Sequence, residues 1–106
     1  MRKRAGSARF FPFQEYMKIY DLTTEGEKEP LGLDRKDPAF SWKIGGENLF
    51  QTWYRVRVAS SREALEVGRP DMWDSGIVRS GRTLAVRYGG KPLRERTVYF
   101  WTVETD

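Results

Sequence analysis

The stretch Tyr99-Phe100-Trp101-Thr102-Val103 decides the fold, because its large inward side chains stand two residues apart. Phe40-Ser41-Trp42-Lys43-Ile44 and Tyr54-Arg55-Val56-Arg57-Val58 repeat the same spacing. Successive side chains of a β-strand point to opposite faces, so a period of two predicts a strand with one buried face. The three segments together predict one apolar interior between two layers of extended chain. Six side chains should meet in that interior: Phe40, Trp42, Tyr54, Val56, Tyr99 and Trp101.

Shorter segments between Gly- and Pro-containing turns complete the prediction of an all-β chain. Residues 18–22 and 72–78 have strand character, and 83–88 should place Leu84, Val86 and Tyr88 inward. Ser61 is placed to cap one short helical turn that ends at Val67. Short strands at even intervals with almost no helix predict an immunoglobulin- or fibronectin type III-like antiparallel β-sandwich.

Composition limits the classes of partner and cofactor. The chain has 106 residues, enough for one domain, and its 39% apolar content argues against disorder. The net charge is +4, but Met1–Tyr16 alone holds four basic residues against one acidic residue, a net +3. A basic segment is not a basic face, so we predict no nucleic-acid partner. The chain lacks cysteine and histidine. This excludes disulfides and most zinc or haem sites, and we predict no metal or cofactor site.

Residues 1–16 look like an extension ahead of the sandwich, which we expect to span residues 17–106. The extension is interpreted as a disordered tail or as a wrongly assigned upstream start. Its apolar run, Phe10-Phe11-Pro12-Phe13, is too short and too broken for a secretory signal. No run in the chain has the length that a membrane-spanning helix needs, so no membrane partner is predicted.

Tyr99 carries the most specific structural signal. It lies near the start of the last predicted strand, six residues after Leu93. This spacing resembles a tyrosine corner, in which a Tyr hydroxyl bonds back to the upstream main chain and fixes a crossover between sheets. The alternative is that Tyr99 is one more core aromatic residue.

Four segments, in the same order, resemble the N-terminal β-sandwich domain of bacterial α-L-rhamnosidases of glycoside hydrolase family 78. The resemblance covers Leu22 to Asp106, and each motif is weak alone. The segments are Pro30–Asp34 with Pro38–Trp42, Gln51–Ser61, Asp71–Gly76 and Leu93–Val103. The resemblance implies a non-catalytic accessory domain that packs on and positions a catalytic (α/α)₆ barrel, and it places the catalytic carboxylates in that barrel.

The resemblance also implies a further strand after Asp106, so the sandwich is expected to lack its last strand. Thr97 to Thr105 would then expose unpaired main-chain groups along one side. Such an edge is a template for strand addition. We therefore expect self-association through this strand and marginal stability of the monomer.

No residues in the chain predict catalysis. Glycoside hydrolysis needs two carboxyl groups flanking the scissile bond, and most acidic residues here lie in loops or charged surface runs. Asp71 and Asp74 flank Trp73, which is compatible with a sugar site. Turn chemistry at Asp74-Ser75-Gly76 and packing of Trp73 explain the pattern better. We predict no catalytic residue and no enzyme activity on this chain.

Trp53, Arg55, Arg57 and Phe100 should point away from the predicted core. Aromatic side chains beside arginines suit either an interface with a neighbouring domain or a ligand such as a sugar. The interface is the preferred interpretation if the family resemblance holds. The alternative function is a free-standing β-sandwich that binds carbohydrate or protein through these residues.

Overall fold

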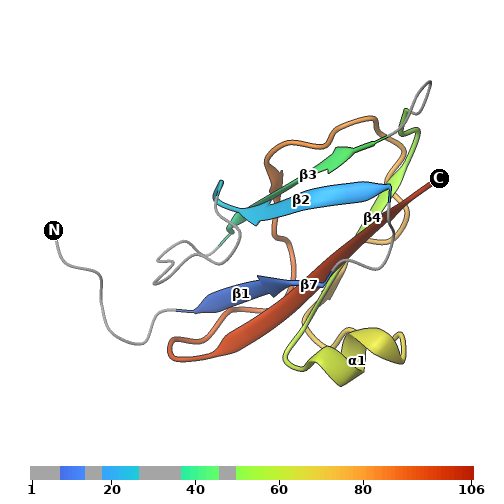
Figure 1. The fold of residues 1–106 in the computed structure, drawn as a ribbon. Coiled ribbons are helices and arrows are strands. Elements are labelled where there is room, and N and C mark those ends of the chain that lie inside the picture. The colour runs from blue at the N-terminus through green and yellow to red at the C-terminus, as the bar shows by residue number, and fades with distance from the viewer. Residues whose placement is uncertain (1–7, 14–17, 27–36, 46–49) are drawn as a thin grey trace, which may run out of the picture.

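The structure, a computed structural model, describes residues 8–13, 18–26, 37–45 and 50–106, and their strands form two facing sheets (Figure 1). The larger sheet has the order β1-β7-β4-β5 and the smaller one the order β2-β3-β6. The predicted immunoglobulin-like sandwich is confirmed. The larger sheet contains β1 (Arg9–Pro12), β7 (Val98–Thr105), β4 (Tyr54–Ala59) and β5 (Trp73–Asp74). The smaller sheet contains β2 (Ile19–Thr24), β3 (Ala39–Ile44) and β6 (Val86–Arg87).

The core lies between the sheets, and the six predicted side chains all belong to it. Phe40 is central: its ring lies 4.5 Å from that of Trp101 and 5.6 Å from that of Phe10, centroid to centroid. Trp42 packs edge-on against Tyr54 at 5.4 Å. Offset and edge-on geometries are those that aromatic pairs prefer. The alternation of apolar residues along β3, β4 and β7 therefore produces one shared interior.

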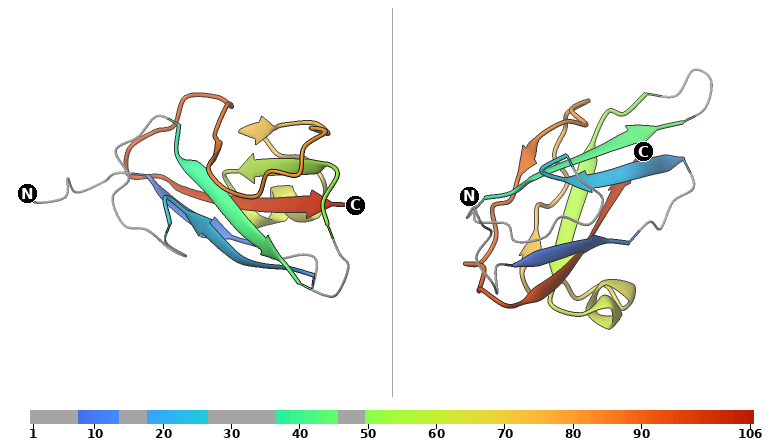
Figure 2. Two further views of the ribbon diagram at one scale, coloured as in Figure 1. Left: turned by 90° about the horizontal axis from the view of Figure 1, so that it is seen from above. Right: turned by 60° about the vertical axis from the view of Figure 1, so that its left-hand side comes forward.

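The antiparallel pair β4 and β7 forms the centre of the larger sheet, in register from Tyr54 opposite Thr105 to Ala59 opposite Phe100. After β4 the chain enters α1 (Arg62–Glu66), where the Ser61 hydroxyl accepts a hydrogen bond from the Ala64 N–H at 3.1 Å. The predicted cap is confirmed. The helix lies against β4 and β7, on the side of this sheet away from β2 and β3 (Figures 1 and 2).

The prediction for Leu84 was wrong, since its side chain is 68% exposed whereas Val86 and Tyr88 are buried as expected. Ala85 explains the difference. Its φ of +54° lies in the left-handed region, so the chain cannot continue the alternation of an extended strand through this residue. The strand is accordingly confined to Val86–Arg87.

Residues 8–13 also differ from expectation, because they are neither disordered nor separate from the sandwich. They contain β1, which pairs parallel with β7, and the Phe10 side chain is fully buried. The predicted free edge of Thr97 to Thr105 is thus covered from Val98 to Trp101, and one pair of the sandwich is parallel. The rest of the extension, 1–7 and 14–16, and the expected domain start at Met17 lie outside the described residues.

Candidate interdomain surface and end pocket

Charged side chains form ion pairs with one another on the outer face of the larger sheet. Arg55 donates two hydrogen bonds to the Asp74 carboxylate, one of them from Nε to Oδ1 at 2.8 Å. Glu104 lies 3.7 Å from the Arg55 guanidinium and 3.9 Å from that of Arg57. The hydrogen bonds from Arg55 hold the pKa of Asp74 below its ordinary value. These charges therefore bond mainly to one another, which leaves fewer free groups for a ligand.

Aromatic rings continue this outer face toward β1. Phe100 on β7 packs against Phe11 on β1, with ring centroids 5.8 Å apart. The Arg9 guanidinium lies 5.1 Å from the centre of the Phe11 ring. The structure thus places Arg55, Arg57 and Phe100 on one face, all half-buried, whereas Trp53 precedes β4 and is also half-buried.

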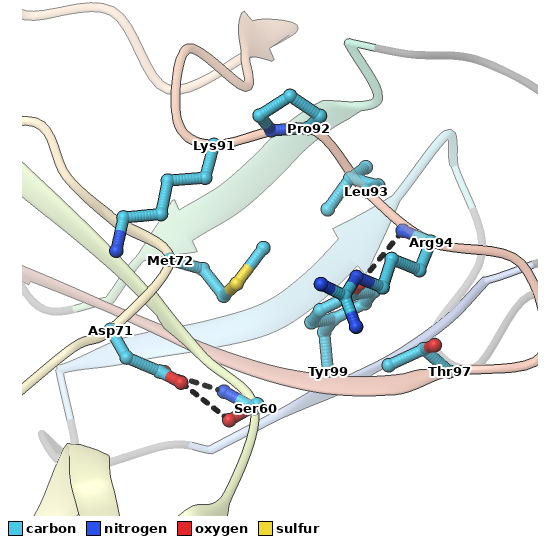
Figure 3. A pocket seen from close by; sticks show the side chains of 9 residues that line it. All are labelled: Ser60, Asp71, Met72, Lys91, Pro92, Leu93, Arg94, Thr97 and Tyr99. Carbon is cyan, nitrogen blue, oxygen red and sulfur yellow. Dashed lines mark hydrogen bonds between the residues drawn. The ribbon is translucent and has the colours of Figure 1, made fainter.

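A cavity of about 600 Å³ opens beside the connection that leads into β7 (Figure 3). Its lining is polar and apolar in comparable parts, and Asp71 supplies its one carboxylate. Asp71 accepts hydrogen bonds from the Ser60 N–H at 2.8 Å and hydroxyl at 2.5 Å. A single carboxylate cannot provide the acid and base pair of a glycosidase. The lining residues are Ser60, Asp71, Met72, Lys91, Pro92, Leu93, Arg94, Thr97 and Tyr99.

Partial burial and hydrogen bonding act in opposite directions on Asp71. Burial raises its pKa, but the two hydrogen bonds from Ser60, a main-chain hydrogen bond of Asp71 and the charge of Lys91 together bring the pKa below its ordinary value. A carboxyl group that stays ionised at neutral pH is poorly suited to act as a general acid. Its hydrogen bonds instead join the end of β4 to the segment before β5.

Tyr99 forms the inner wall of this pocket, and its ring is buried. Its hydroxyl accepts a hydrogen bond from the main-chain N–H of Arg94 at 2.8 Å (Figure 3). Leu93, the residue before Arg94, is half-buried against the core. The bond therefore spans the chain segment that enters β7.

Trp73 is a packing residue. Its ring centroid lies 5.4 Å from that of Tyr88 and 6.3 Å from that of Phe40, so the indole covers one end of the core. Asp74 accepts a hydrogen bond from the Gly76 N–H at 2.9 Å, and Gly76 has a φ of +68°. Both observations agree with the packing and turn interpretation rather than with a sugar site.

The sequence did not predict the hydrogen bonds that Gln51 makes. Its buried side chain accepts a hydrogen bond from the Trp42 indole N–H at 2.9 Å and donates to the carbonyl groups of Ser80 and Arg82. Its neighbour Phe50 is 75% exposed. A single Gln before a strand gives no local signal for these contacts, since its partners lie 9 to 31 residues away.

No helix in the described part of the chain has the length and apolar character to cross a membrane. The Asp and Glu residues of that part do not form a group of three or more that could hold a metal ion.

Comparison with known proteins agrees with this geometry. A profile described as Rha78A-like, N-terminal immunoglobulin domain, matches residues 19–106. The α-L-rhamnosidase of Streptomyces avermitilis is 42% identical over 89 residues, which cover 82% of this chain and 8% of that protein. An α-L-rhamnosidase of Formosa agariphila is 39% identical over 83 residues, covering 76% and 9%.

Solved structures give the same result. The α-L-rhamnosidase from Dictyoglumus thermophilum superposes with a TM-score of 0.78 at 40% identity, covering 83% of this chain and 10% of that one. The Streptomyces avermitilis α-L-rhamnosidase complexed with L-rhamnose gives 0.77 at 41% identity, covering 83% and 9%. The chain thus spans a tenth or less of the length of these relatives. It belongs to the family of Rha78A-like N-terminal immunoglobulin domains.

Proposed function

We propose that this chain serves an α-L-rhamnosidase-like glycoside hydrolase as an accessory domain that packs on and positions the other domains. One observation carries the proposal. Residues 19–106 match an N-terminal immunoglobulin domain whose relatives are about ten times longer. A β-sandwich with a filled core and no paired carboxylates in its described pocket is suited to packing rather than chemistry.

The outer face around Arg57 and Phe100 is the first candidate for the docking surface. Arg55, Arg57 and Phe100 are half-buried there, with Trp53 just before β4. Half-buried aromatic and arginine side chains are enriched where protein surfaces meet. The ion pairs with Asp74 and Glu104 fix the arginines in place, which lowers the entropy lost on docking.

The end of the sandwich near Gln51 is the second candidate. Phe50, Ile77 and Leu84 are each more than 60% exposed, and the segments that carry them meet at the hydrogen bonds of Gln51. Large apolar side chains exposed on one end of a domain mark a surface for a partner. A neighbouring domain that covered Phe50 and Leu84 would gain about 1.5–3 kcal/mol for each side chain fully buried.

A chimera tests the proposal. The whole 106-residue chain replaces the matching N-terminal segment of the Streptomyces avermitilis α-L-rhamnosidase. We expect the chimera to hydrolyse a chromogenic α-L-rhamnoside and to melt cooperatively at a higher temperature than the same enzyme without its N-terminal domain. A chimera no more stable and no more active than the truncated enzyme would contradict the proposal.

Surface variants of the chimera then separate the two candidate faces. R57A/F100A alters the outer face, and F50S/L84S alters the end near Gln51. Y20S is the control, because Tyr20 is an exposed residue of β2, on the other sheet. The docking face is the one whose variant lowers the melting temperature of the chimera by more than it does in the isolated chain. If each of the three variants lowers the melting temperature by the same amount in the chimera as in the isolated chain, neither face is an interface and the docking role is refuted.

Self-association through Thr97 to Thr105 is the second proposal. It is favoured because β1 pairs with only the first part of β7. Among the described strands, only β1 pairs with the outer edge of β7, and it stops at Trp101. Tyr54 exchanges hydrogen bonds with Val78, so the main-chain groups of Thr105 opposite it point away from β4. T105P should therefore reduce any dimer seen by analytical ultracentrifugation while leaving the β4 pairing intact. A dimer of unchanged affinity would exclude this edge.

The tyrosine corner also stays a proposal. Its support is the hydrogen bond from the Arg94 N–H to the Tyr99 hydroxyl and the half-buried Leu93 beside it. Its role here would be to hold the crossover into β7 at a fixed position. This would fix the position of β7, which contributes Phe100 to the first candidate face and the edge proposed for self-association.

A further inference from the structure

We propose that the outer edge of β7 is a binding site for an extended aromatic peptide segment, and that residues 8–13 occupy it as an exchangeable ligand. The same segment, supplied by a separate molecule, would bind in the same parallel register. The proposal concerns an interaction surface of this chain, and it does not depend on the accessory role in a hydrolase.

Main-chain hydrogen bonds define the site. The Arg9 N–H donates to the Thr97 carbonyl at 3.0 Å, and the Phe13 N–H donates to the Trp101 carbonyl at 2.7 Å. Residues at alternate positions of a strand direct their main-chain groups to the same side. Pro12, one position out of phase, therefore directs its missing N–H away from β7, where its absence costs no bond to that strand.

Phe10 is the anchor of the segment. Its side chain is fully buried, with its ring 5.4 Å from that of Tyr99 and 5.6 Å from that of Phe40. Phe11, the next residue, points to the outer face and is only half-buried against Phe100. This arrangement is typical of strand addition, in which main-chain hydrogen bonds give affinity and pockets for alternate side chains give specificity.

The position of β1 makes it separable. It is the terminal strand of its sheet, with β7 as its one partner strand among the described elements. It also lies ahead of residues 19–106, which match the immunoglobulin domain without it. The acceptor therefore consists of β7 and the core rings, and the ligand is a short segment that contributes one deeply buried side chain.

A labelled peptide of residues 8–13, Ala-Arg-Phe-Phe-Pro-Phe with blocked termini, tests binding in trans to the full chain. The acceptor variant is F10D, whose own segment cannot place a carboxylate among apolar rings. We expect fluorescence anisotropy to show saturable binding to F10D and binding at least tenfold weaker to the wild-type chain, whose site is occupied. No binding to a cooperatively folded F10D chain, or equal binding to both chains, would overturn the proposal.

Two adjacent phenylalanines supply the matched control. A peptide with Phe10→Ala should lose affinity on the order of 100-fold, because it lacks the buried ring. A peptide with Phe11→Ala should lose much less. Equal losses from the two peptides would show that the segment binds as a nonspecific apolar chain and would overturn the assigned register.

A cross-link keeps the proposal testable if F10D does not fold. Phe11 and Phe100 are register partners, and the chain has no cysteine of its own, so F11C/F100C can form one defined disulfide. We expect the oxidised monomer to retain its segment and to bind the peptide at least tenfold more weakly than the reduced form does. Equal peptide binding by both forms would place the peptide elsewhere and refute the site.

Discussion

The buried side chain of Gln51 accepts a hydrogen bond from the indole N–H of Trp42 at 2.9 Å, which joins the smaller sheet to the segment before β4. The Gln51 amide nitrogen also donates to two carbonyl groups, those of Ser80 and Arg82, at 3.0 and 2.7 Å. One polar side chain thus provides the acceptor for a core tryptophan and the donors for two main-chain carbonyl groups in the loop 80–82.

Replacing Gln51 by Leu should lower the free energy of unfolding by about 2–4 kcal/mol, because it leaves one buried donor and two carbonyl groups without this partner. Urea unfolding followed by tryptophan fluorescence measures the loss. Q51E retains an acceptor for Trp42 but removes the donor groups and adds a buried carboxylate that faces the two carbonyl groups, so we expect it to destabilise the chain as well. A Q51L chain as stable as the wild type would show that water replaces this network without cost.

Gly90 should tolerate no side chain, whereas Gly89 should. A Cβ on Gly90 would overlap the Met72 carbonyl and the Trp73 Cβ and would lie 2.6 Å from the Tyr88 hydroxyl. A Cβ on Gly89 would meet the Trp73 ring at an ordinary 3.5 Å. We expect G90A to destabilise the chain by about 1–3 kcal/mol, and G89A to change its stability by less than about 0.5 kcal/mol. Thermal melting compares the two, and similar melting temperatures would contradict the packing described for this turn.

Removing the Tyr99 hydroxyl should weaken the entry into β7. Y99F retains the buried ring and deletes only the acceptor of the Arg94 N–H, so we expect a loss of about 0.5–1.5 kcal/mol. The Arg94 amide should also exchange its hydrogen faster, which a purely apolar role of Tyr99 would not produce. Y20F is the control, because Tyr20 is 42% exposed. Unchanged exchange at Arg94 in Y99F would remove the support for a tyrosine corner.

Acid should destabilise the chain partly through Asp74. Its folded-state pKa lies below the unfolded value because Arg55 bonds to the carboxylate, so its contribution is complete above about pH 4 and is lost as pH falls through the folded pKa. The pair is about one-third exposed, which limits the effect to about 0.2–1 kcal/mol. Stability measured from pH 6 to pH 2 should therefore fall less in D74N than in the wild type.

The two other carboxylates with a lowered pKa, Asp71 and Asp106, do not confuse this comparison. Hydrogen bonds from the Thr52 hydroxyl and N–H lower the pKa of Asp106 to about 2, and the pKa of Asp71 is also lowered. Both groups remain in the wild type and in D74N, so the difference between the two curves reports Asp74. Parallel curves would show that the Arg55 pair contributes nothing to stability.

The sequence predicted the parts of the fold that follow a local pattern. Alternating apolar residues identified β3, β4 and β7 with their inward faces, and Ser61 identified the start of α1. These features depend on periods and caps that a few adjacent residues determine.

The sequence could not predict features that depend on distant partners. β1 is only four residues long and contains Pro12. It pairs in parallel with a strand about 90 residues away, so no adjacent turn indicates the pairing. The outward turn of Leu84 depends on the conformation of Ala85, a residue with no intrinsic preference for positive φ.

Hydrogen–deuterium exchange, measured on the isolated chain and on the chimera with the Streptomyces avermitilis enzyme, tests the docking role most directly. We predict slower amide exchange in the chimera on one face, either around Arg57 and Phe100 or around Phe50 and Leu84, with unchanged exchange around Tyr20 on the other sheet. Identical exchange throughout the domain in both proteins would show that it packs on nothing, and would contradict the account.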